Sequence, residues 1–371
     1  MKLTIERAAL LRALAHVQSV VERRNTIPIL SNVRLEAKDS SLRLTATDMD
    51  LAIVESVVAD IGQEDATTIP AHTLYDIVRK LPEGAQIEID DAAEGGRVVV
   101  CAGRSRFTLG SLPVEDFPVM AEGDLPHGFS LDAASLRRLI DKTRFAVSTE
   151  ETRYYLNGIY LHAVADGARA LRAVATDGHR LARVEIALPD GAGDMPGIIV
   201  PRKAVAELRK LIEDADGDVA VQLSDSKIRF AFGDVVLTSK LIDGTFPDYE
   251  RVVPVDNDKT MTVVTKSLLD AVDRVSTIST EKSRAIKLIV ETGKLTLTAT
   301  SPEEGSATEE IDADYTGEQI EIGFNSRYVL DMAAQIEGDL VELVMADGTS
   351  PTLVRDTGDE GALYVIMPMR V

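Results

Sequence analysis

One stretch of the chain, Asp177-Gly178-His179-Arg180, combines residue types that can do chemistry. A carboxylate and an imidazole two residues apart at a tight turn are suited to general acid–base catalysis. Such a pair also needs a nucleophile or a metal beside it, and the sequence offers no third member. The favoured alternative is a turn in which Asp177 accepts hydrogen bonds from backbone amides, as its counterparts Asp48 and Ser301 would. We therefore predict no catalytic residue.

Signatures of nucleotide, zinc and hydrolase sites are missing from the sequence. It contains no G-x-x-x-x-G-K-[ST], no G-x-G-x-x-G opening a helix, no H-E-x-x-H and no G-x-S-x-G. The five histidines are scattered, and Cys101 is the only cysteine, so neither an intrachain disulfide nor a cysteine-rich metal site can form. We expect no metal, no cofactor and no enzymatic activity.

The composition is that of a soluble protein with a strong negative charge. The 371 residues include 40 Lys and Arg against 61 Asp and Glu, a net charge of −21. Such a chain repels polyanions at long range, so it should not coat nucleic acid or an anionic membrane nonspecifically. Charge enters the first seven residues too early for a secretory signal, and no apolar run is long enough to span a membrane. We expect a cytoplasmic protein with no membrane partner.

The elements that must position these residues occur three times along the chain. A strand-like phrase ending in a small-residue turn spans 42–48, 171–177 and 295–301, with the last residues 129 and 124 positions apart. A second phrase follows each copy from Ile69, Val200 and Ile322, and a third precedes each copy from Leu3, Phe129 and Met261. Three phrases in the same order indicate tandem repeats of one design. We predict three domains, at 1–124, 125–256 and 257–371.

Within each repeat the apolar pattern alternates between helical and strand periods. We predict helices at 6–24, 71–80, 132–144, 202–212, 266–284 and 325–336. Thr-rich alternation such as that of residues 294–300 is typical of half-buried strands. Because the helices are separated by several strands rather than by one, an α+β fold with antiparallel sheets is expected.

The predicted helices are net basic, although the chain as a whole is strongly acidic. They contain 19 Lys and Arg and 10 Asp and Glu, a net of +9, so the remainder of the chain must carry −30. For any one helix the simpler interpretation is a solvated face. If all three repeats place their helices on one side, however, that side becomes a basic surface. It would then hold a phosphate backbone without reading its sequence.

Several motifs make the chain similar to a known family. They are Tyr154-Tyr-Leu-Asn-Gly158, Ala175-Thr-Asp-Gly-His-Arg-Leu181, Val200-Pro-Arg-Lys203, Thr238-Ser-Lys-Leu241, Phe246-Pro-Asp-Tyr249 and Val365-Ile-Met-Pro-Met-Arg370, together with Ile27-Pro-Ile-Leu30 and Gly103-Arg-Ser-Arg-Phe107. With these residues the chain resembles the beta subunits of bacterial DNA polymerase III, the sliding clamps. The motifs span all three repeats, and Thr-Asp-Gly-His-Arg-Leu and Met-Pro-Met-Arg are the most specific.

The resemblance implies a fold and a set of partners. Each chain would contain three similar domains, each with two helices packed on antiparallel sheets. Two chains would close head to tail into a six-domain ring around double-stranded DNA, with the helices on the inner wall. The ring would be a nonenzymatic processivity factor. Its partners would be DNA, a second copy of itself, the polymerase III catalytic subunit, a clamp loader, and other polymerases and repair proteins that carry clamp-binding peptides.

The resemblance also assigns residues to three sites. The partner-peptide groove would comprise Leu156, Thr176, Gly178, His179, Arg180, Leu181, Pro247, Arg251, Val252, Val365, Met367, Pro368, Met369 and Arg370. Residues that would contact DNA are Arg24, Tyr154 and Tyr155, to which the charge pattern adds Arg79, Lys80, Arg138 and Lys203. The dimer interface would include Arg104, Arg106, Phe107, Leu109, Ile278, Glu303 and Glu304. Strand 106–112 would be an exposed sheet edge unless another chain pairs with it.

Two other classes of function stay open from the residues alone. One is an enzyme built around Asp177 and His179. The other is a monomeric scaffold whose basic helix face binds an acidic protein. A ring differs from both, because it stays on closed circular DNA and is lost when the circle is cut.

Overall fold

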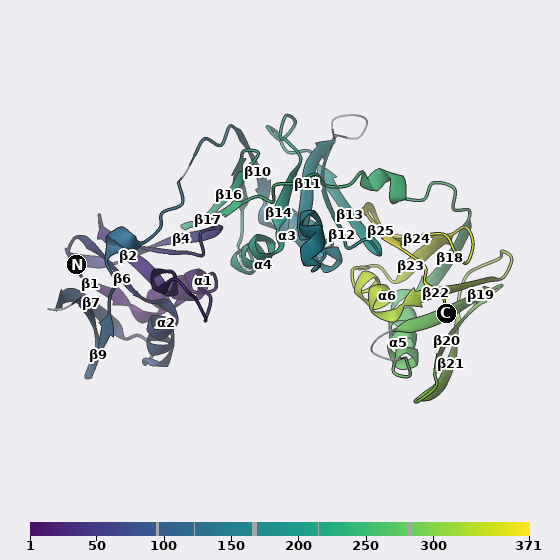
Figure 1. Ribbon diagram of the computed structural model, residues 1–371, viewed down its shortest axis with the longest axis horizontal. Helices are drawn as coiled ribbons and strands as arrows, with labels where there is room; N and C mark the ends of the chain where they lie inside the picture. The colour runs from purple at the N-terminus through teal and green to yellow at the C-terminus, as the bar shows by residue number, and fades with distance from the viewer. Residues whose placement is uncertain (94–95, 122, 165–168, 214, 280–283) are drawn as a thin grey trace. The chain divides into compact units, whose positions relative to one another are not determined.

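A computed structural model describes residues 1–93, 96–121, 123–164, 169–213, 215–279 and 284–371 (Figure 1). The chain packs as two compact units. The first comprises 1–134, 190–195 and 203–241, and the second comprises 135–189, 196–202 and 242–371. Within the described residues, no helix is long and apolar enough to cross a membrane.

The three repeats have the same order of elements, except that the first has an additional short strand, β5. The first contains β1 (Lys2–Glu6), α1 (Arg7–Val17), β2 (Asn32–Lys38), β3 (Ser41–Thr47), β4 (Leu51–Val58), β5 (Asp60–Gln63), β6 (Asp65–Pro70), α2 (Ala71–Lys80), β7 (Gln86–Ala93), β8 (Arg97–Ala102) and β9 (Ser105–Gly110). The second contains β10 (His127–Asp132), α3 (Ala133–Asp141), β11 (Gly158–Val164), β12 (Ala170–Thr176), β13 (Arg180–Ala187), β14 (Ile198–Pro201), α4 (Arg202–Leu211), β15 (Asp218–Leu223), β16 (Lys227–Phe232) and β17 (Val235–Lys240). The third contains β18 (Lys259–Val264), α5 (Thr265–Ser276), β19 (Ala285–Glu291), β20 (Lys294–Ser301), β21 (Gly305–Asp312), β22 (Ile320–Asn325), α6 (Ser326–Ala333), β23 (Leu340–Met345), β24 (Thr352–Asp356) and β25 (Asp359–Ile366).

Four antiparallel sheets join these strands, as the α+β prediction requires. In the first unit the orders are β5-β1-β7-β8-β9 and β10-β15-β16-β17-β4-β3-β2-β6. In the second unit they are β14-β11-β12-β13-β25-β24-β23-β18 and β21-β20-β19-β22. The two eight-stranded sheets each combine strands of neighbouring repeats, through the β17–β4 pair and the β13–β25 pair. We call these two sheets the first and the second junction.

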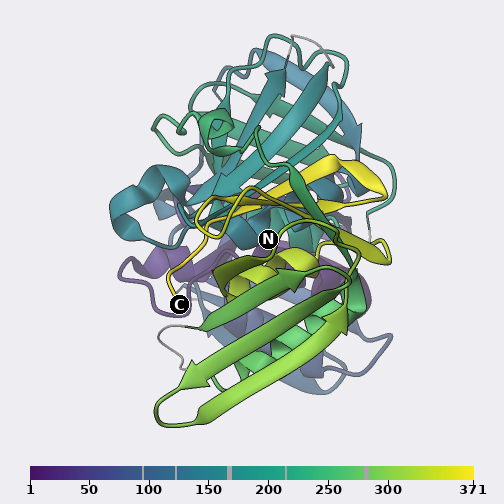
Figure 2. The same ribbon diagram turned by 90° about the vertical axis from the view of Figure 1, so that its right-hand side faces the viewer.

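Alternation along the strands decides which face each sheet buries. In β3, Leu42, Leu44 and Ala46 are buried on the face covered by α1, while Arg43 and Thr45 point to the other face. In the second unit, α5 and α6 pack together, and α5 lies against β20 and β21 (Figure 2). The helices therefore form the cores with one sheet face and leave the opposite face for other contacts.

Four helices are several residues shorter than predicted, and the largest differences are at the ends of α1 and α5. The helix predicted at 6–24 ends at Val17, and the buried Val20 and Val21 continue the period in hydrogen-bonded turns instead. The helix predicted at 266–284 ends at Ser276, where the hydroxyls of Ser276 and Thr277 both donate to the Asp273 carbonyl. Such bonds compete with the helical backbone pattern. Residues 280–283 of that prediction lie outside the described residues.

Candidate functional site

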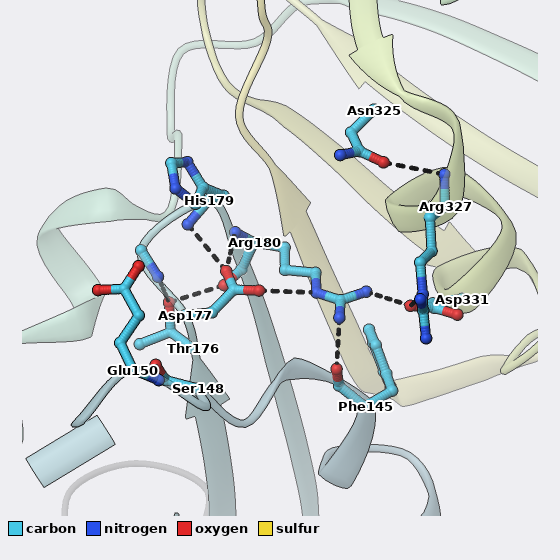
Figure 3. Close-up of polar contacts among 11 residues, drawn as sticks. Phe145, Ser148, Glu150, Thr176, Asp177, His179, Arg180, Asn325, Arg327 and Asp331 are labelled. Carbon is cyan, nitrogen blue, oxygen red and sulfur yellow. Dashed lines mark hydrogen bonds and ion pairs between the residues drawn. The ribbon is translucent and has the colours of Figure 1, made fainter. Parts of the chain in front are cut away.

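The Asp177 stretch is a tight turn between β12 and β13, as predicted (Figure 3). The Asp177 carboxylate accepts hydrogen bonds from the backbone amides of His179 and Arg180 at 2.9 and 3.1 Å. The Thr176 hydroxyl donates to the Arg180 carbonyl and accepts from the Gly178 amide. Gly178 has a φ of 88°, a conformation that glycine adopts without strain. The carboxylate is thus engaged in closing the turn.

The other repeats close the equivalent turn in the same way. Asp48 accepts from the amides of Asp50 and Leu51, and the Ser301 hydroxyl accepts from the amides of Glu303 and Glu304. The expectation that Asp48 and Ser301 replace Asp177 in this role is confirmed. A motif that recurs with the same backbone contacts in every repeat is a structural element of the fold.

The Arg180 guanidinium is fully engaged inside the second unit (Figure 3). It donates to the carboxylates of Asp177 and Asp331 and to the Phe145 carbonyl, at 3.1, 2.6 and 2.6 Å. It also lies over the ring of Tyr328, 4.3 Å from its centre. Arg180 is one of the predicted groove residues, and these contacts hold its guanidinium in place. We infer that Arg180 shapes the groove wall rather than reaching for a ligand.

A cavity of about 260 Å³ lies beside this turn. Nine of the predicted groove residues line it, namely Leu156, Thr176, Gly178, Arg180, Leu181, Pro247, Val252, Val365 and Met367. Arg153, Tyr155, Asp248 and Tyr249 line it as well. The sequence reasoning missed Arg153, Asp248 and Tyr249 as lining residues and placed Tyr155 with the DNA contacts. Three of the four belong to the Tyr-Tyr-Leu and Phe-Pro-Asp-Tyr motifs, so the motifs could have indicated them as groove residues.

The floor of this groove is apolar and well packed. Leu156, Leu181 and Val365 are buried in a cluster with Val174, Ile199, Leu353 and Leu363. Met367 is 39% exposed at the rim, and Val252 is 48% exposed. An apolar depression with exposed flexible side chains at its rim suits the side chains of a short peptide.

One wall of the groove is the segment 246–253, which is anchored to the sheet by stacking and hydrogen bonds. Phe246 stacks on Tyr160 with ring centres 4.8 Å apart and nearly parallel planes. The buried Tyr249 hydroxyl contacts His162 Nε2 at 3.0 Å and accepts from Arg172 at 3.3 Å. Burial lowers the pKa of His162 below its usual value of 6.5, so the ring is neutral at pH 7. The wall is therefore preorganised without a ligand.

The remaining predicted groove residues do not line this cavity. Pro368, Met369 and Arg370 line a second, more polar depression with Gly323, Thr349 and other residues. His179 is exposed and stacks on Tyr328 with ring centres 6.3 Å apart. Arg251 is exposed and pairs with Asp248 at 2.7 Å. Their role in partner binding stays a prediction.

The predicted DNA contacts fall into two groups. Arg24 is exposed in the segment after α1 rather than on a helix, which corrects its predicted setting. Arg79 and Lys80 are exposed at the end of α2, and Arg79 pairs with Asp76 at 3.3 Å. Tyr154 is 54% exposed and meets Tyr155 edge-on. Arg24, Arg79, Lys80 and Tyr154 are therefore accessible to a phosphate backbone, whereas Tyr155 is half-buried against the groove cluster.

The other two predicted DNA contacts already have acidic partners. Arg138 donates two hydrogen bonds to Asp359, at 2.8 and 2.7 Å. Lys203 lies 2.5 Å from Asp48 and 3.3 Å from Glu22. Burial alone would lower the pKa of Lys203, but its hydrogen bond to Asp48 and the two negative charges raise it above the usual value. Both cations are fixed in place and largely neutralised, so they offer less to DNA than the sequence suggested.

The residues predicted at the dimer interface lie at two sheet ends. Phe107 and Leu109 are half-buried on β9, with Arg104 and Arg106 exposed beside them. β9 is an edge strand in the described part of the chain, as predicted. Glu303 and Glu304 are exposed in the turn before β21, which is an edge strand of the sheet β21-β20-β19-β22. Ile278 follows α5, which packs on β21.

Comparisons with known proteins agree with this architecture. The family descriptions for the N-terminal, central and C-terminal domains of the DNA polymerase III beta subunit match residues 1–121, 130–248 and 250–370. The Beta sliding clamp of Caulobacter vibrioides is 57% identical over the full length of both chains. A crystal structure of the C. crescentus clamp matches with a TM-score of 0.98 and 57% identity over 100% of this chain and 99% of that one. The Bartonella birtlesii clamp bound to griselimycin matches with 0.97 and 50%, over the whole of both chains.

Proposed function

The chain belongs to the family of bacterial DNA polymerase III beta subunits, the DNA sliding clamps, and on that premise we propose how its own residues close the ring, contact DNA and hold partners. A clamp is a non-catalytic processivity factor, which matches an Asp177 carboxylate occupied by backbone amides. DNA, the polymerase and a second copy of the chain are its partners.

The main support for ring closure is that, among the described residues, the first and the third repeat each have an edge strand without the partner that the equivalent strand has at a junction. At the first junction, β17, the last strand of the second repeat, pairs with β4 of the first repeat. At the second junction, β25, the last strand of the third repeat, pairs with β13 of the second repeat. Both β4 and β13 are the third strand after the first helix of their repeat. In the described residues, β9 and β21 are the equivalent strands that lack this partner. Pairing β9 of one chain with β21 of another would repeat the junction and leave no such edge open.

The repeats also supply a register for this pairing. Ser239 pairs with Leu51 at the first junction, and Ile366 pairs with Arg180 at the second. Leu109 follows the β8–β9 turn at the same distance as Ser239 follows the β16–β17 turn. Glu304 follows Ser301 as Leu51 follows Asp48 and as Arg180 follows Asp177. We therefore place Leu109 opposite Glu304 and Phe107 opposite Ser306 across the interface.

For DNA, we propose that Arg24, Arg79, Lys80, Tyr154 and Tyr155 contact the backbone of the encircled duplex. The exposure of Arg24, Arg79, Lys80 and Tyr154 supports this role, and the half-buried Tyr155 lies beside Tyr154. Contacts to phosphate carry no sequence information. Arg138 and Lys203 would contribute mainly by shaping the surface, because Asp359, Asp48 and Glu22 neutralise them.

For partners, we propose that the groove of the second unit holds short clamp-binding peptides. They would come from the polymerase III catalytic subunit, the clamp loader, and other polymerases and repair proteins, in the cytoplasm. Apolar peptide side chains would fill the depression above Leu156, Leu181 and Val365, with Met367 adapting at the rim.

Retention on DNA circles, after loading by a family clamp loader with ATP, tests the ring. The protein should stay on a nicked circle through gel filtration and leave once the circle is linearised. Phe107→Arg should reduce the mass in light scattering from twice 40.1 kDa toward a single chain and abolish retention. Thr108→Arg, at the exposed neighbouring position of β9, tells whether any charge on this edge has that effect. Equal retention on both DNA forms, or a Phe107→Arg dimer as stable as the parent, would contradict the proposed closure.

A further inference from the structure

The first junction contains a cavity that no role described above uses. Its volume is about 330 Å³, and it lies on the sheet face opposite α1. The strands β2, β3, β4, β16 and β17 form its base, and the segment 118–121 forms one side. It is lined by Arg34, Glu36, Arg43, Thr45, Thr47, Ala52, Val54, Pro118, Val119, Met120, Ala121, Arg229, Val236 and Thr238.

When equivalent positions of the repeats are compared, this cavity corresponds to the peptide groove. Thr47 and Ala52 occupy the positions that Thr176 and Leu181 hold in the second junction. The connecting segment begins with Phe117-Pro118 here and with Phe246-Pro247 there. Both cavities therefore lie between a central sheet face and the segment that leads to the next repeat.

Three arginines distinguish the first-junction cavity from the groove. Arg43 is the counterpart of Arg172, which is neutralised by Glu185 and Glu250 at 2.7 and 2.8 Å. On β4 the cross-strand partner of Arg43 is Ser56, where Arg172 has Glu185. On β2 the residue opposite Arg43 is Glu36, which pairs with Arg34 instead. The position of Glu250 is taken by Ala121, counted from the Phe-Pro pair. Arg43 thus has neither carboxylate.

The other two arginines are also incompletely paired. Arg34 lies 3.3 Å from Glu36, the one carboxylate among the lining residues, and its Nε is buried without a hydrogen-bond partner in the described structure. Arg229 is half-buried, and neither it nor Arg43 forms an ion pair with any described residue. Guanidinium groups without an acidic partner can donate charge-assisted hydrogen bonds to a ligand carboxylate. The cavity carries two net positive charges in a chain of net charge −21.

The apolar side of the cavity narrows the class of ligand. Val54, Val236, Val119 and Met120 line it, and Val119 is 70% exposed. The segment is tethered at its far end, where Lys227 Nζ donates to the Ala121 carbonyl at 2.8 Å. An inorganic anion would use the arginines and leave the apolar side in water, whereas an acidic peptide would use both.

We propose that this cavity binds an acidic peptide segment of a partner protein. A carboxylate of the peptide accepts from the guanidinium groups of Arg43 and Arg229. A neighbouring apolar side chain packs on Val119 and Met120. The clamp then offers two chemically different peptide sites per chain, an apolar groove at the second junction and a cationic cavity at the first.

Fluorescence polarisation with a capped, labelled Val-Asp-Val-Asp peptide tests this site on the full chain. The matched Val-Asn-Val-Asn peptide should bind at least about tenfold more weakly, because charge-assisted bonds are lost. The double substitution Arg43→Gln and Arg229→Gln should lower the affinity for the acidic peptide by a similar factor. Lys38→Gln, on the same strand as Arg34 but outside the cavity, should leave it within about twofold.

Several outcomes would overturn the proposal. One is equal binding of the two peptides, and another is unchanged binding by the double variant. Absence of saturable binding at millimolar peptide would do the same. Displacement of the acidic peptide by inorganic phosphate at equal concentration would show a simple anion site, and displacement by a short oligonucleotide would show a nucleic-acid site. A groove-binding peptide, run in parallel, should keep its affinity in every variant, so a failure here leaves the groove assignment intact.

Discussion

The two junctions have the same backbone plan and different chemistry. In the second junction, Arg172 is enclosed by Glu185, Glu250 and the Tyr249 hydroxyl, and the cavity beside it is apolar. In the first junction, the equivalent Arg43 forms no ion pair with a described residue, and the cavity keeps a net positive charge. The charge balance of each site therefore depends on a few cross-strand positions rather than on the fold.

The connecting segments differ for the same reason. Tyr160 offers Phe246 a ring to stack on, and His162 and Arg172 hold Tyr249. The equivalent positions in the first junction are Arg34, Glu36 and Arg43, which offer no aromatic surface. There Phe117 packs instead with Ile29 and Leu30, and the residues after it are half-buried or exposed. The connecting segment is thus anchored to the sheet at the second junction and is more open at the first.

The largest expected effect comes from placing a charge at the apolar rim. Met367→Glu should weaken binding of a polymerase-derived clamp peptide by roughly a hundredfold, because a desolvated carboxylate would face an apolar ligand. Val119→Glu, at the rim of the first junction, should leave that affinity unchanged. Fluorescence polarisation measures both. Equal losses in the two variants would mean that the two cavities do not act independently.

The next effect separates the two equivalent arginines. Arg172→Met should lower the free energy of unfolding by about 2 kcal/mol, because Glu185 and Tyr249 lose a mostly buried donor. Arg43→Met should change it by less than about 0.5 kcal/mol, since Arg43 is exposed and forms no ion pair with a described residue. Urea unfolding monitored by circular dichroism gives both values. A large loss in the Arg43 variant would show that this arginine has a structural partner.

Conversion of one junction into the other gives a smaller effect. Ser56→Glu with Ala121→Glu should supply Arg43 with the two acids that Arg172 has, and raise stability by up to about 1 kcal/mol. The same variant should lose affinity for the acidic peptide. The isosteric Ser56→Gln with Ala121→Gln provides the uncharged control. Retained acidic-peptide binding in the Glu variant would separate Arg43 from that site.

The smallest effect concerns His162 and pH. Its pKa is lowered by burial, with Arg172 also opposing protonation and Glu250 and the Ala163 carbonyl favouring it, while Tyr160 and Tyr249 face the ring. Between the folded pKa and 6.5 the unfolded chain binds more protons, so stability should fall as pH falls through that window. His162→Gln should remove this component. NMR titration of the imidazole checks the pKa, and a folded-state value above 6.5 would contradict the expectation.

Local features were predictable from the sequence because their partners lie a few residues away. The turn at Asp177 closes through amides two and three residues later, and the same spacing is visible at Asp48 and Ser301. Helix ends were harder to predict, because buried residues such as Val21 continue the apolar period through turns. The groove lining was largely identified through the family motifs rather than through the period.

The sequence by itself determined the three repeats, the antiparallel α+β plan and the family, because these depend on recurring local patterns and specific motifs. Only the tertiary structure decided which cations are free. Arg138 meets Asp359 across 221 residues, and Lys203 meets Asp48 across 155. Arg43 faces Ser56 where Arg172 faces Glu185, a difference that needs the strand register. Electrostatic partners are set by distance in space, and that distance is fixed only when the sheets pair.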